Sequence, residues 1–171
     1  MLGYRKKSFA RAHSLLNTLR ANLDDLDTLK SLQQLLFGEV VRTERKIREL
    51  KSELKNVIQA GGANAAKRSS GLRSRIEKVR QCAYVWRCFG DAIAFLYMDK
   101  FALKQCFYNV ENGNPKQDAG FIADKSGLPN EIALLEFALQ QHVPALLVDL
   151  TNTIRHGDIC LRAARTLIYL K

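Results

Sequence analysis

One long apolar stripe constrains the fold of this chain more than any other feature. Between residues 26 and 57, Leu, Ile and Val recur at three- and four-residue steps, with a polar interruption at Thr43. This spacing is the period of an α-helix with one apolar face. A helix longer than thirty residues needs a partner of similar length to cover that face, as in a coiled coil. Its outer face is expected to carry the charged residues Glu44, Arg45, Lys46 and Arg48.

The partner helix follows a segment of small and polar residues at positions 60–71, which predicts a flexible turn. Beyond it, a second apolar stripe extends from Leu72 to Ile93, so the two helices are predicted to pack antiparallel. Residues 8–22 show the same helical period and predict a shorter helix before the hairpin. Asp24, Asp25 and Asp27 lie between these two helices as candidate N-cap and first-turn carboxylates.

The charge of the chain is concentrated in its first half. Residues 1–90 contain 19 Lys and Arg against 8 Asp and Glu, whereas residues 91–171 contain 8 against 9. Such a surface favours a polyanion, and the backbone of DNA or RNA is the expected partner. The residues expected to bind it lie around the hairpin tip: Lys67, Arg68, Arg73, Arg75, Lys78 and Arg80. A solvated helix that is charged only for solubility, or one that simply covers the C-terminal region, is a second interpretation.

The second half mixes helix and strand signals. Residues 100–108 are predicted as a strand and residues 110–127 as a loop, and Pro129 opens a short helix. The apolar run 145–148 predicts a buried strand, residues 153–161 are expected to be extended, and a last apolar run covers 167–170. The fold class is therefore α+β: a basic helical hairpin region over residues 1–98, then a small and incomplete αβ region over 99–171.

Composition excludes several classes of protein. The chain has 171 residues, 47% of them apolar, so it can bury a core without disulfides. No apolar run is long enough to cross a membrane, and no secretory signal is evident, so we expect a cytoplasmic protein. The four cysteines have no C-x-x-C spacing and do not cluster with histidine, which argues against zinc.

Polar residues near the C-terminus carry the only catalytic signal. Asp158 lies on an expected strand, and the chain ends on Tyr169-Leu170-Lys171. This spacing resembles the PD-(D/E)xK nuclease superfamily, in which an Asp and an acid-x-Lys triplet hold magnesium and position a water for phosphodiester cleavage. The resemblance implies Asp158 as a metal ligand, Lys171 as the group that orients the water, and Glu131 as the helical carboxylate of the site.

The chain departs from that family at a decisive position. Tyr169 occupies the place of the acidic residue, and a phenol is a poor ligand for Mg²⁺. The strands and helix that complete such a fold are also missing, so we expect a truncated or degenerate nuclease-like unit without catalytic competence. Asp149, by contrast, is expected only to stabilise a turn, and Asp91 and Asp99 are expected to be capping or solvated groups.

These observations predict a nucleic-acid-associated protein. Association would occur through the basic hairpin, and a magnesium cofactor would be needed only if the nuclease-like site functions. The alternative is a module for protein–protein interaction, such as a homodimer formed through apolar surface left over on the hairpin.

Overall fold

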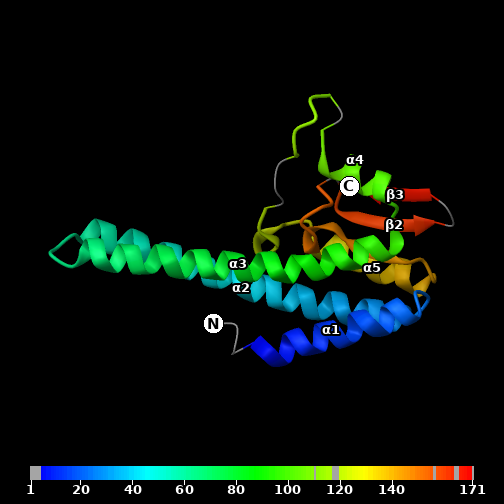
Figure 1. The fold of residues 1–171 in the computed structure, drawn as a ribbon, viewed down its shortest axis with the longest axis horizontal. Coiled ribbons are helices and arrows are strands. Elements are labelled where there is room, and N and C mark those ends of the chain that lie inside the picture. The colour runs from blue at the N-terminus through cyan, green and yellow to red at the C-terminus, as the bar shows by residue number, and fades with distance from the viewer. Residues whose placement is uncertain (1–4, 110, 117–119, 156, 164–165, 171) are drawn as a thin grey trace.

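A computed structural model describes residues 5–109, 111–116, 120–155, 157–163 and 166–170. In chain order the elements are α1 (Lys6–Ala21), α2 (Leu26–Ala60), α3 (Ala65–Tyr97), α4 (Lys100–Phe107), η2 (Ile122–Asp124), α5 (Leu128–Gln140), β1 (Ala145–Leu147), η3 (Val148–Leu150), β2 (Ile159–Ala163) and β3 (Thr166–Leu170). The fold is α+β, as predicted. Its longest elements, α2 and α3, form an antiparallel hairpin that projects well beyond the rest of the molecule (Figure 1).

The hairpin forms because its two helices bury complementary apolar stripes. Helix α2 begins at Asp25, whose side chain accepts a hydrogen bond from the backbone N–H of Thr28 at 2.9 Å. The predicted turn was too long, because α3 already begins at Ala65 and only residues 61–64 are non-helical. Alanine, lysine and arginine at positions 65–68 are strong helix formers, and packing against α2 keeps the following Ser and Gly residues helical.

The projecting part of the hairpin has a small core of its own. We call residues 45–82 the distal arm. Its core consists of Ile47, Leu50, Val57, Leu72, Ile76 and Val79, and it is separate from the main core. The predicted outer face of α2 was wrong at Glu44, which is fully buried, because the αβ region covers the hairpin at that position.

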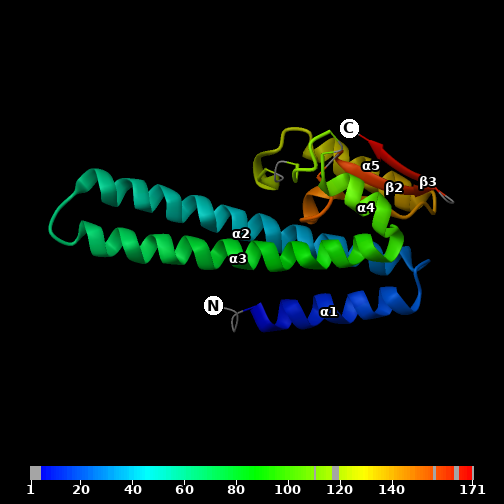
Figure 2. The same ribbon diagram turned by 45° about the horizontal axis from the view of Figure 1, so that its top comes forward.

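The base of the hairpin lies between two layers. Helix α1 covers one side, and the αβ region covers the opposite side (Figure 2). On the α1 side, the rings of Phe9 and Trp86 stack with centroids 4.0 Å apart. Thr43, the polar interruption of the α2 stripe, is buried there and accepts a hydrogen bond from the guanidinium of Arg5 at 2.6 Å. The interruption is therefore a contact site for the N-terminal segment.

Helix α4 replaces the strand that was predicted for residues 100–108. Asp99 caps it by accepting hydrogen bonds from the backbone N–H groups of Phe101 and Ala102, at 2.8 and 3.0 Å. The buried positions are Leu103 and Cys106, which lie three residues apart on one helical face. The strand prediction placed Phe101, Leu103 and Phe107 on one face, but in the helix Leu103 is buried whereas Phe101 is exposed. A capping aspartate and the tertiary packing outweighed the strand pattern.

Three short antiparallel strands in the order β1-β2-β3 form the only sheet in the described chain. Ala145 pairs with Leu161, and Ile159 pairs with Leu170. The buried Gln33 of α2 secures β1 to the hairpin: its amide donates to the carbonyl of Ala145 at 2.9 Å and accepts from the N–H of Leu147 at 3.0 Å. This long-range contact satisfies two backbone groups that burial would otherwise leave unpaired.

Close approach of α3 to η3 requires glycine at position 90. A Cβ atom there would lie 1.9 Å from the carbonyl oxygen of Leu150, a distance that no side chain can adopt.

One continuous apolar core extends from the hairpin base (Leu36, Trp86) to α5 and the strands (Leu135, Leu147). None of the described helices combines the length and apolar character needed to cross a bilayer.

Candidate functional site

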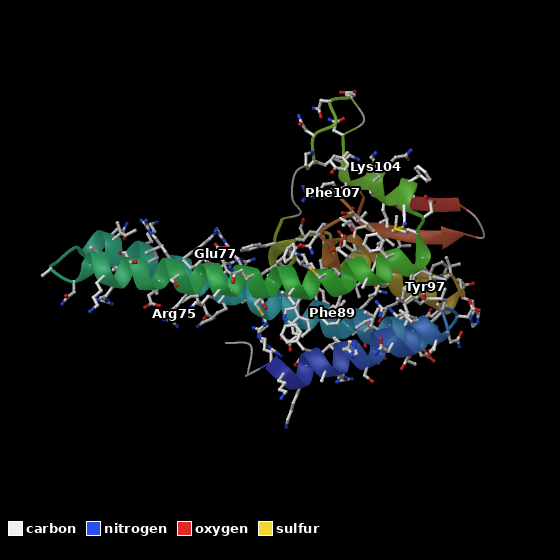
Figure 3. All side chains as sticks on the ribbon, viewed as in Figure 1. Arg75, Glu77, Phe89, Tyr97, Lys104 and Phe107 are labelled. Atoms are coloured by element: carbon white, nitrogen blue, oxygen red, sulfur yellow. The ribbon has the colours of Figure 1, made fainter. Side chains whose placement is uncertain are left out.

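The distal arm is a cationic projection. It contains 11 Lys and Arg against 3 Asp and Glu, a net charge of +8 out of +10 for the whole chain. The six residues predicted to bind nucleic acid all lie on α3 and are all exposed: Lys67, Arg68, Arg73, Arg75, Lys78 and Arg80. Figure 3 shows side chains standing outward along this part of the hairpin, with Arg75 and Glu77 labelled.

Few of these cations are neutralised by neighbours. Arg80 lies 3.5 Å from Glu77, a contact between two exposed side chains, and Lys46 lies 2.7 Å from Glu49. Ion pairs between exposed side chains contribute little to folding stability, and the cation of such a pair can readily exchange its partner for another anion. Within the described residues, no ion pair involves the other five predicted cations. The arm therefore presents positive charge to solvent along its length.

A second cluster surrounds the ammonium group of Lys125. Its Nζ atom lies 3.0 Å from Glu131, 2.9 Å from Asp149 and 2.5 Å from Asp158, measured to the nearest carboxylate oxygen. Glu131 is in the first turn of α5, Asp149 is in η3, and Asp158 immediately precedes β2. Three elements of the αβ region are thus held together at one cation.

The cluster keeps the lysine charged. Burial by itself would lower the pKa of Lys125, but hydrogen bonds to Asp158, Asp149 and Glu131 outweigh it and hold the pKa above its ordinary value. One oxygen of Glu131 contacts Lys125, while the other is buried without a hydrogen-bond partner in the described part of the chain. Lys125 is therefore the main compensation for a largely buried carboxylate.

The structure brings together two of the three predicted catalytic residues, Glu131 and Asp158. The third, Lys171, lies outside the described residues. Lys125 was not predicted from the sequence, and Asp149 was expected only to stabilise a turn. The only signal in the sequence was that Lys125 directly follows an aspartate in the loop. Such Asp-Lys pairs are common in solvated segments. Only the folding of the loop back onto η3 and β2 gives this lysine its position.

The carboxylates of this cluster do not fit a magnesium ion as they stand. Their negative charge is directed at one ammonium group, and hard divalent cations need such oxygen ligands for themselves. No group of three or more His, Cys, Asp or Glu residues that could hold a metal ion occurs among the residues described. We therefore assign no metal-dependent step to Asp158.

Further polar contacts secure the αβ region to the hairpin. Glu44 accepts a hydrogen bond from Arg87 at 2.8 Å and another from the backbone N–H of Ala123 at 3.1 Å. Burial raises the pKa of Glu44, even though both contacts favour its ionised form. Asp91 is neither a helix cap nor solvated; it accepts from the backbone N–H groups of Asn152 and Thr153 at 2.8 and 2.9 Å. These contacts set the position of the 151–155 loop on α3.

Comparison with known proteins identifies no relative from which a function could be transferred. No family model, no curated protein and no solved structure matches the chain.

Proposed function

We propose that this protein binds nucleic acid through the distal arm. The observation that carries the proposal is the net charge of +8 on an element in which most large apolar residues pack in its own small core. An arm that projects beyond the body adds little to the main core, so its many exposed charges need another explanation than packing (Figure 1). Phosphate groups spaced along a polymer complement such an elongated cationic surface.

The interaction we propose is with the backbone, not with base edges. Lys and Arg on an exposed helix can approach phosphates of any sequence, and each contact releases a condensed counterion. Binding should therefore be weakly dependent on sequence and strongly dependent on salt.

A salt titration tests the proposal directly. We expect the logarithm of the association constant for a duplex to fall linearly with the logarithm of the salt concentration, with a slope steeper than about −4. Fluorescence anisotropy with labelled DNA and RNA at several salt concentrations measures that slope. A flat salt dependence, or no binding at low salt, would contradict the proposal.

Dimerisation through the hairpin is the competing proposal. It needs apolar surface. The exposed Tyr84, Val85 and Phe95 supply some on the part of α3 outside the distal arm, whereas within the arm the only exposed large hydrophobic residue is Ile58, at 53%. This scarcity favours a polyanion over a second copy as the partner of the arm. Light scattering on the same samples separates the two, since a dimer that ignores nucleic acid would support the competing proposal.

We propose that the αβ region is a degenerate relative of the PD-(D/E)xK nucleases. The convergence of Glu131 and Asp158, from a helix and the start of the following antiparallel strand pair, supports the relationship. Lys125 supports the loss of activity, because it neutralises the carboxylates that a metal would need.

We accordingly expect no magnesium-dependent cleavage of DNA or RNA by this chain. Supercoiled plasmid and labelled oligonucleotides, incubated with and without Mg²⁺ and resolved on gels, measure it. Cleavage that requires Mg²⁺ and disappears in Asp158→Ala would show that the site is functional, and would overturn the proposed loss of activity.

A further inference from the structure

A cleft of about 380 Å³ lies at the base of the distal arm. One wall comes from the hairpin and includes Arg80, Tyr84 and Arg87; the other comes from the loops of the αβ region and includes Phe121 and Arg155. Its volume is within the range of about 300–1,000 Å³ that is typical of small-molecule sites, and such sites often lie where two structural units meet. Of its lining residues, Arg80 alone is among the six predicted nucleic-acid contacts, and none belongs to the Lys125 cluster.

The cleft is cationic. Three arginines line it against one carboxylate, that of Glu44, which is already bonded to Arg87. Arg87 and Arg155 are held in place: Arg87 also donates to the carbonyl of Asp149 at 3.1 Å, and Arg155 donates to carbonyl oxygens and lies 4.3 Å above the ring centroid of Phe107. These contacts occupy donors of Arg87 and Arg155, so the exposed Arg80 is the arginine of the cleft best placed to bind an anion with several oxygens, such as a phosphate.

Aromatic surface adjoins the cationic groups. Tyr84 is 60% exposed and Phe121 is 38% exposed, and both border the cleft. Arg48 and Lys51 lie 5.4 and 5.7 Å from the centroid of the Phe121 ring, which continues the cationic surface from the arm to the cleft. An exposed ring beside an anion site is the arrangement on which a nucleobase stacks.

We propose that this cleft binds a nucleoside phosphate, with the phosphate against Arg80 and the base against Tyr84. A terminal phosphate carries nearly two negative charges at neutral pH, whereas a phosphodiester carries one, so the cleft favours a monoester. The ligand is either a free nucleotide or the phosphorylated end of a strand that lies along the arm. The second source rests on the proposed function; the first does not.

Calorimetric titration with AMP, adenosine and inorganic phosphate tests the cleft by itself. AMP should bind at least about tenfold more tightly than either fragment, because only AMP engages both Arg80 and the aromatic surface. Arg80→Gln and Tyr84→Ala should each lower AMP affinity about tenfold, with unchanged melting temperature. Matched controls outside the cleft, Arg11→Gln and Phe95→Ala, should leave it unchanged; Phe95 is 57% exposed on the same helix as Tyr84.

Oligonucleotides with a 5′-phosphate or a 5′-hydroxyl distinguish the two sources. Tighter binding of the 5′-phosphorylated strand, lost in Arg80→Gln but retained in Arg75→Gln, identifies the strand end as the ligand. AMP binding without this preference identifies a free nucleotide. If AMP binds and no oligonucleotide does, the proposed function fails and the cleft stands. If oligonucleotides bind without a phosphate preference and AMP does not bind, the cleft proposal is overturned while the proposed function stands.

Discussion

Replacing the six predicted nucleic-acid-binding cations of α3 by glutamine should weaken binding to duplex DNA at least about 100-fold near 0.1 M salt. The slope of log affinity against log salt is negative, and each lost phosphate contact makes it shallower by about 0.9. The magnitude of the slope should therefore decrease by up to about 5. Glutamine is a good helix former and the substituted side chains are exposed, so the hairpin should remain folded. Anisotropy titrations at several salt concentrations measure both quantities. The substituted residues are Lys67, Arg68, Arg73, Arg75, Lys78 and Arg80.

A control with the same change in net charge separates the arm from general attraction. It replaces six exposed cations outside the arm by glutamine: Lys6, Lys7, Arg11, Arg20, Lys100 and Lys104. This variant should retain most of the affinity and most of the salt slope, because its cations do not follow one elongated surface. Equal losses in the two variants would mean that net charge alone governs binding, and the assignment of the interface to the arm would be wrong.

Lys125→Met should lower the free energy of unfolding by about 3 kcal/mol. The substitution leaves three carboxylates facing one another around an apolar side chain, and breaking a buried ion pair typically costs about 3–5 kcal/mol. We expect the low end of that range because Asp158 and Lys125 are each about one-third exposed. Urea denaturation at neutral pH measures the change, provided that both variants unfold in a single transition.

Lys30→Met is the matched control for this prediction. Lys30 pairs with Glu136 at 3.2 Å, but both side chains are well exposed, so its loss should cost less than about 1 kcal/mol. Destabilisation of the two variants by similar amounts would show that Lys125 does not hold the αβ region together.

The difference between Lys125→Met and the natural protein should also depend on pH. Since folding raises the pKa of Lys125 above its ordinary value of about 10.4, its contribution to stability is fully present below that pH. It declines as the pH rises further, through the pKa of the folded state, where the ammonium loses its proton. Unfolding curves at pH 7, 9 and 11 should show a constant difference between the first two and a smaller one at the third. A difference that grows above pH 10 would have the wrong sign for this mechanism.

Local periodicity was sufficient to predict the hairpin. The α2 stripe, the second stripe on α3 and the capping carboxylate at Asp25 are each encoded within a few residues, and a helical face of that length leaves few ways to cover it. The same kind of reasoning failed for α4, where the spacing of Phe101, Leu103 and Phe107 suggested a strand while Asp99 caps a helix. In short segments, local patterns for helix and strand overlap, and packing decides between them.

The candidate sites divide in the same way. The charge of the distal arm follows from composition along the chain, and its exposure follows from the helical period, so all six cations could be named in advance. Lys125 and the cleft could not be named. The groups that meet at Lys125 come from positions 125, 131, 149 and 158, and the cleft joins the hairpin to loops more than thirty residues away.

The sequence alone therefore determined the long hairpin and the location of its charge, because both depend on interactions between residues three or four positions apart. Tertiary structure decided the burial of Glu44, the partners of Asp91 and Asp149, and the central role of Lys125. Each of these depends on which distant segment covers a polar side chain, and the energy of a charged group is set by that covering as much as by its identity. The position of a charge along the chain is a local property, whereas its compensation is a property of the folded molecule.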